Sequence, residues 1–192
     1  MGMPAKHSRR WSRNDVLALM EASPLQTPRY EVVRGELLVT PSPTPLHQFA
    51  VFELAKTLSA YCEATGIGET LISPSDVDLE NGRGLVQPDV YVVAPGEGLR
   101  IRRENTVRIL LLCAEVVSAG SVRGDRGPKR RLYHAAVPVY WTVDLHRREV
   151  EEWISGRQGV AVERERLTWL PSGADRPFLL ALAAYFAKVH AD

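Results

Sequence analysis

The sequence predicts one α/β (α+β) domain in which helices flank a mixed β-sheet. Two segments, 85–93 and 107–117, are almost continuously apolar, as strands buried on both faces of a sheet are. Segments before and after them show the apolar spacing of helices. The chain has 192 residues, and neither a linker nor an internal repeat divides it. We therefore expect a single domain over residues 1–192.

The elements follow one another in a mixed order that fits such a sheet. Ser12 and Asp15 form a helix N-cap pair, which predicts an N-terminal helical segment over about 12–22. An amphipathic helix over about 178–190 is expected to close the chain. Between them we expect a hairpin over 30–40, a helix over 46–64, strands over 69–79, 85–93 and 107–117, a helix over 125–136, strands over 139–144 and 150–154, and one further strand within 160–169.

The charge balance excludes a chain that is basic throughout. Lys and Arg number 24 and Asp and Glu 23, so the formal net charge is +1. A role in nucleic-acid binding must therefore rest on a local site. The longest apolar run, 109–114, is far shorter than the ~20 residues that cross a bilayer. Cys62 and Cys113 lie among apolar neighbours and are expected to be reduced core residues, as in a cytoplasmic protein that does not enter a membrane.

Two acidic residues interrupt the apolar strands. Asp89 lies in 85–93 and Glu115 in 107–117. Carboxylates are rarely buried unless they are paired, so either each acid forms a salt bridge with an arginine, or both acids share a divalent cation. We expect two partly buried acids that repel each other, so Asp89→Asn should be more heat-stable than the wild type without metal. With salt-bridged acids, the same variant would melt at a lower temperature.

A lysine is expected on the inner face of the helix over 125–136. Counting back by three and four from Leu132, Tyr133 and Ala136 places Lys129 on the same face. Such a lysine either extends along the edge of the core to solvent or faces the two carboxylates. Lysine can lose its proton and act as a base, whereas arginine stays charged.

The ordered set of these residues resembles the PD-(D/E)xK nuclease superfamily, and more narrowly a bacterial family of putative restriction endonucleases described as a domain of unknown function. The resemblance implies a restriction-endonuclease-like mixed sheet flanked by helices. The matching segments are 30–37, 41–43 with His47 and Gln48, 73–77, 87–89, 115–118, 125–129 with Tyr133, and 137–144.

The resemblance implies a set of site residues. Asp89, after Pro88, matches the first acid of the motif, and Glu115 matches the second. The usual lysine two residues after the second acid is absent, and the resemblance places it on the following helix, at Lys129. Asp89, Glu115 and the backbone carbonyl of Val116 are the implied ligands of Mg²⁺ or Mn²⁺.

Two further residues have competing interpretations. Glu31 matches a glutamate of the family and is expected as a fourth catalytic residue, although an exposed hairpin acid is an equal alternative. His47 could contact a phosphate or a water, but we favour a histidine that simply begins a helix. The loop at 118–121 departs from the Ser-Pro-Ser that the family usually has after the second acid.

The activity that the resemblance implies is metal-dependent hydrolysis of phosphodiester bonds in DNA by a homodimer. Lys129 would orient or deprotonate the attacking water, or neutralise charge on the phosphate. Arg126, Arg130 and Arg131 would either contact backbone phosphates or form a solvated helix face. One alternative is a nuclease-like scaffold that binds DNA or a protein without cutting. A hydrolase of small phosphate esters ranks last, because the chain has no glycine-rich phosphate loop.

Overall fold

A six-stranded mixed sheet forms the centre of the protein. The computed structural model describes residues 10–23, 28–81, 83–97, 107–117 and 125–191. The strand order is β3-β4-β5-β6-β7-β8, and only β5 and β6 pair in parallel. The strands are β3 (Glu69–Ile72), β4 (Val90–Val93), β5 (Leu112–Val117), β6 (Val139–Asp144), β7 (Glu149–Ile154) and β8 (Ala161–Glu163). This arrangement confirms the predicted α+β class.

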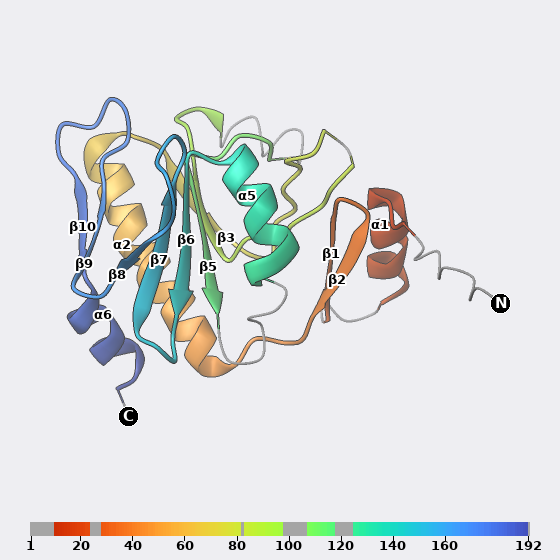
Figure 1. Ribbon diagram of the computed structural model, residues 1–192, viewed down its shortest axis with the longest axis horizontal. Coiled ribbons are helices and arrows are strands. Elements are labelled where there is room, and N and C mark those ends of the chain that lie inside the picture. Colours follow the sequence, from red (N-terminus) through yellow and green to blue (C-terminus); the bar gives the residue numbers. More distant parts are fainter. Residues whose placement is uncertain (1–9, 24–27, 82, 98–106, 118–124, 192) are drawn as a thin grey trace.

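One face of the sheet carries the larger core. It is covered by α2 (Pro45–Thr65), α6 (Leu182–Val189) and a hairpin of β9 (Arg166–Trp169) and β10 (Phe178–Ala181) (Figure 1). Alternate strand residues point to this face, as the period of two in a strand requires. The fully buried side chains of Leu54, Trp141 and Leu182 belong to this core.

The opposite face is covered by α5 (Arg130–Ala136), which follows a π-helical turn, Asp125–Lys129. Tyr91, Cys113, Tyr133 and Tyr140 are buried there. Beside α5 lies the hairpin of β1 (Arg29–Val33) and β2 (Glu36–Thr40) (Figure 1). Helix α1 (Arg13–Ala22) packs on this hairpin, with Val16 and Val32 in a third cluster. No helix in the described part of the chain has both the length and the apolar character needed to cross a membrane.

Several strands are shorter than the sequence predicts. The strand expected over 69–79 ends at Ile72, and the one expected over 85–93 joins the sheet only at Val90. Pro74 comes two residues after the end of β3, and Pro88 two residues before the start of β4. A proline has no N–H to donate to a sheet ladder. The strand expected over 107–117 begins only at Leu112, and Ile109, which lies before it, is 58% exposed.

The two ends of the chain differ in how well they match the prediction. Helix α1 has the expected cap, since the Ser12 hydroxyl accepts from the backbone N–H of Asp15 and the Asp15 carboxylate accepts from the backbone N–H of Ser12. The helix expected over 178–190 begins only at Leu182. The preceding Phe178–Ala181 is a strand paired with β9, with alternating burial that a short apolar run does not reveal. The region 160–169 contains two strands, β8 and β9, where one was expected.

Candidate active site

The register of two strands brings the two acids side by side. β4 and β5 pair antiparallel, with Val90 opposite Ala114, and the same register places Asp89 opposite Glu115. Opposite residues of an antiparallel pair have side chains on the same face. Asp89 is 2% exposed and Glu115 1% exposed. The two carboxylates therefore lie next to each other within the protein, beneath α5.

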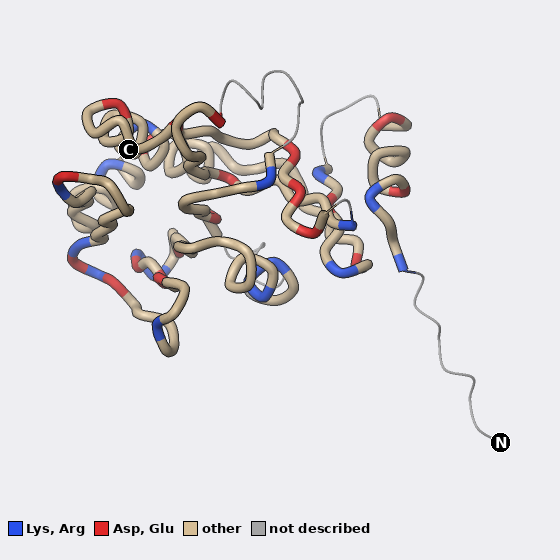
Figure 2. Tube along the Cα trace, turned by 90° about the horizontal axis from the view of Figure 1, so that it is seen from above, with Lys and Arg blue, Asp and Glu red and all other residues tan. Residues whose placement is uncertain are grey.

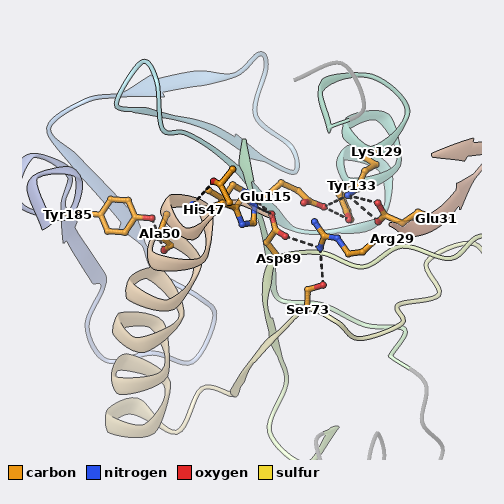
Figure 3. Close-up of polar contacts among 12 residues, drawn as sticks. Arg29, Glu31, His47, Ala50, Ser73, Asp89, Glu115, Lys129, Tyr133 and Tyr185 are labelled. Carbon is orange, nitrogen blue, oxygen red and sulfur yellow. Dashed lines mark hydrogen bonds and ion pairs between the residues drawn. The ribbon is translucent and has the colours of Figure 1, made fainter. Parts of the chain in front are cut away.

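Lys129 joins two acids from different elements. Its side chain is 2% exposed, and its Nζ lies 2.8 Å from Oε1 of Glu115 and 3.1 Å from Oε1 of Glu31 (Figure 3). The hydroxyl of Tyr133, one helical turn after Lys129, donates to Oε1 of Glu115 over 2.8 Å. Charges taken out of water need close partners of opposite sign, and here one ammonium has two.

Asp89 has its own set of partners. Arg29 donates from Nη1 to Oδ1 over 3.1 Å, and the same nitrogen donates to the Ser73 hydroxyl over 2.9 Å. Nε2 of His47 lies 3.1 Å from Oδ2, and the backbone N–H of Val116 donates to Oδ2 over 3.0 Å. Figure 3 shows Arg29 and His47 reaching Asp89 from β1 and α2. Asp89 is thus paired through both of its oxygens.

These contacts shift the ionisation of the buried groups. Burial raises the pKa of Asp89, but the hydrogen bond and charge of His47 and the charges of Arg29 and Lys129 outweigh burial, and the net pKa lies well below its usual value. Burial, and then the charge of Glu115, raise the pKa of the Tyr133 hydroxyl well above its ordinary value. Asp89 is therefore ionised, and Tyr133 keeps its proton as a hydrogen-bond donor.

The four residues expected to be catalytic lie in one connected cluster. Asp89, Glu115, Lys129 and Glu31 are all buried. Glu31 is 0% exposed and also accepts a hydrogen bond from the backbone N–H of Gln87 over 2.7 Å, so the alternative of an exposed hairpin acid is wrong. Lys129 does not extend to solvent along the core edge.

The interpretation of His47 as a residue that simply begins a helix is wrong. Thr44 caps α2, since its hydroxyl accepts from the backbone N–H of His47, and this places His47 in the first turn. Its side chain is buried against Asp89, and its Nδ1 is buried with no hydrogen-bond partner among the described residues. Arg29 was not expected at the site. The signal for it was its position two residues before Glu31, because residues i and i+2 of a strand share a face.

Other expected features lie elsewhere. Arg130 pairs with Glu151 at 3.4 Å, and Arg131 is exposed on α5. The side chain of Arg126 and the loop 118–121 are outside the described residues. Cys62 and Cys113 are free and buried, as expected, and burial raises the pKa of the Cys113 thiol well above its ordinary value.

The donor set fits a hard divalent cation in its chemistry. Three carboxylates, those of Glu31, Asp89 and Glu115, are oxygen donors of the kind that Mg²⁺ and Mn²⁺ prefer. Their present partners are the cationic groups around them. Among the residues that the structure describes, no three His, Cys, Asp or Glu side chains are grouped so as to hold a metal ion. Cation binding at Asp89 therefore competes with the contacts that Asp89 now makes.

Comparisons with known proteins show which fold and which family this chain shares. The fold resembles that in the crystal structure of a putative nuclease belonging to DUF820 from Anabaena variabilis, with a TM-score of 0.72 and 18% identity over 91% of this chain and 98% of that chain. The two chains thus share a fold. The model of the Uma2 family, described as putative restriction endonucleases, matches residues 17–177, and the chain belongs to this family. No match is found among the curated proteins.

Neutralising Glu31 should destabilise the protein. Glu31→Gln leaves the buried ammonium of Lys129 with one carboxylate in place of two, and we expect a loss of about 1–3 kcal/mol in the free energy of unfolding. Glu36→Gln, at an exposed acid of the same hairpin, is the matched control and should change this free energy by less than about 0.5 kcal/mol. Urea unfolding of both variants measures the difference. Equal effects would contradict a buried role for Glu31.

Asp89→Asn should melt at a lower temperature than the wild type in metal-free buffer. The variant removes the anion that Arg29 and His47 contact, and removing one partner of a buried ion pair costs about 3–5 kcal/mol. This reverses the expectation from like-charge repulsion, because the structure pairs the two acids with cations. Since the folded-state pKa of Asp89 is depressed, its stabilisation is present above the unfolded pKa of about 3.9 and is lost as the pH falls through the folded value. Calorimetry at neutral and acid pH should show this difference shrinking in acid; an Asn variant that melts higher at neutral pH would refute the pairing.

Proposed function

We propose that the protein is a metal-dependent endonuclease that hydrolyses phosphodiester bonds in DNA. The observation that supports this most is the placement of two buried acids on neighbouring strands beside the buried Lys129. A polar cluster that is so costly to desolvate is a candidate for function rather than for stability alone. Membership of a family described as putative restriction endonucleases favours a nucleic-acid substrate.

The cation would be held by Asp89, Glu115 and the backbone carbonyl of Val116, and Mg²⁺ or Mn²⁺ suits these oxygens. When bound, such a cation supplies a Lewis acid that polarises the scissile phosphate and lowers the pKa of the attacking water. Arg29 now occupies Oδ1 of Asp89. We therefore expect Arg29 to leave Asp89 on metal binding, which would free its guanidinium for a phosphate oxygen.

The remaining steps belong to side chains of the chain itself. The Nζ of Lys129 lies within hydrogen-bond distance of carboxylate oxygens of Glu31 and Glu115, so in this arrangement Lys129 serves as a hydrogen-bond donor. It would orient the attacking water or neutralise charge that develops on the phosphate. Tyr133 would hold the carboxylate of Glu115 in position through its protonated hydroxyl.

The alternative is a nuclease-like scaffold that binds DNA or a protein without cutting. One observation favours it: Asp89 and Glu115 each already have a cationic partner, so the cluster does not require a metal to balance its charge. Metal-dependent cleavage separates the two proposals. The homodimer and the cytoplasmic location stay predictions alongside either one.

Lys129→Arg should be nearly as inactive as Lys129→Ala. The pocket around Lys129 is closed, with the side chain 2% exposed, and the longer planar guanidinium does not fit the same two contacts. We expect both variants to lose about 10²–10⁴ in the rate of Mg²⁺-dependent cleavage of plasmid DNA, the usual cost of losing a positioned polar group at the reacting centre.

Lys56→Arg is the control, since Lys56 is an exposed lysine on α2 and should cut like the wild type. Chelation of the metal should abolish all cleavage. Cleavage by Lys129→Arg at the wild-type rate would mean that charge alone is needed at this position. A wild type that cuts no DNA with Mg²⁺ or Mn²⁺ would favour the scaffold.

A further inference from the structure

A groove lined by arginines lies outside the candidate active site. It has a volume of about 690 Å³ and is formed by the start of α1, the turn between β1 and β2, and residues 79–81 and 83. Figure 2 shows Lys and Arg positions on α1 and on the segments beside it. The arginines that line the groove are Arg10, Arg13, Arg34 and Arg83.

The arginines of this groove lack acidic partners among the described residues. None of the four forms an ion pair with a residue in the described ranges. Glu80, which lines the groove, accepts from the backbone N–H of Arg34 over 3.1 Å, and Asp15 of α1 caps that helix through Ser12. The residues that line the groove include four arginines and one acid, Glu80, so the groove is positive in a chain whose net charge is only +1.

One arginine of the groove has a donor without an acceptor. The Nε of Arg13 is buried and has no hydrogen-bond partner among the described residues. A buried donor left without a partner costs free energy, which an acceptor oxygen on a ligand would recover. The combination of a positive groove and an unsatisfied N–H fits an anion rich in acceptor oxygens. Guanidinium groups match the oxygens of phosphates in this way.

The arginine groove is joined to the candidate active site by two chain segments. Strand β1 carries Arg29 and Glu31 at the site and leads to Arg34 in the turn, a path of about 17 Å at 3.3 Å per residue. The second segment runs from Arg83 at the groove to Asp89, and Val32 and Leu85 tie the two segments together through backbone hydrogen bonds of 2.8 and 2.9 Å. About 17 Å corresponds to about five base pairs of a duplex. A single duplex can therefore reach both places.

We propose that the arginine groove binds backbone phosphates of the DNA that the proposed endonuclease cleaves, about half a helical turn from the scissile bond. This inference rests on the proposed function for its ligand. Contacts of this kind hold a duplex in register without reading its bases. The groove therefore supplies the local positive site that the nearly neutral chain needs in order to bind a polyanion.

The test measures DNA binding in the absence of cleavage. Fluorescence anisotropy of a labelled duplex of about 30 base pairs, in buffer with EDTA, gives the affinity. Arg34→Ala combined with Arg83→Ala removes two exposed arginines of the groove. The matched control combines Arg148→Ala with Arg166→Ala, because both are exposed and Arg148, like Arg34, is a turn residue with positive φ (52° and 53°). Both double variants should keep the wild-type Tm.

The groove variant should bind the duplex at least about tenfold more weakly, and the slope of log affinity against log salt should fall by about 2. The control should bind like the wild type. Equal binding by the two double variants, or no binding of the duplex by the wild type, would overturn the inference. A wild type that binds through the groove but does not cut with Mg²⁺ would refute the endonuclease and leave the groove standing. If the wild type cuts DNA and the groove variant binds the duplex as tightly as the wild type, the endonuclease stands and the groove inference is refuted.

Discussion

The burial of one ammonium group between two carboxylates is the constraint on which this structure depends. Lys129 comes from the turn before α5, Glu31 from β1 and Glu115 from β5, so one set of charges joins a helix, a hairpin and the central sheet. Breaking a buried ion pair by removing one partner costs about 3–5 kcal/mol, whereas an apolar replacement of the whole set is often neutral. Stability alone therefore does not explain why the charges are there. Their position at the end of two central strands, within reach of one another, points to chemistry.

The cluster has two halves that meet at the paired acids. In one half Lys129 and Tyr133 hold Glu115, and in the other Arg29 and His47 hold Asp89. Each acid is paired with cationic groups of the protein, so its charge is balanced without an added ion. A divalent cation that binds here exchanges one set of partners for another. Arg29, which is the most exposed member of the Asp89 half at 13%, is the partner that we expect to leave.

The parts of this site that follow a regular period were predictable from the sequence. Asp89 and Glu115 stood out because they interrupt apolar strands, and Lys129 because it lies one helical turn before Tyr133. Arg29 follows the same rule, two residues before Glu31, but an arginine at the start of a hairpin does not stand out among 20 arginines. The contact of His47 with Asp89 joins residues 42 apart, and only the tertiary structure shows it. The ends of the strands were misjudged where Pro74 and Pro88 interrupt the ladder, and β10 was misjudged because four apolar residues fit a strand as well as a helix.

The central claim is that these acids hold a catalytic cation, and anomalous diffraction from a crystal soaked in MnCl₂ tests it most directly. The account predicts an anomalous peak between Asp89 and Glu115, with the guanidinium of Arg29 displaced from Oδ1 of Asp89, and Lys129 still in contact with Glu31. The absence of a peak at this position, with Arg29 and His47 still bound to Asp89 at saturating Mn²⁺, would contradict it.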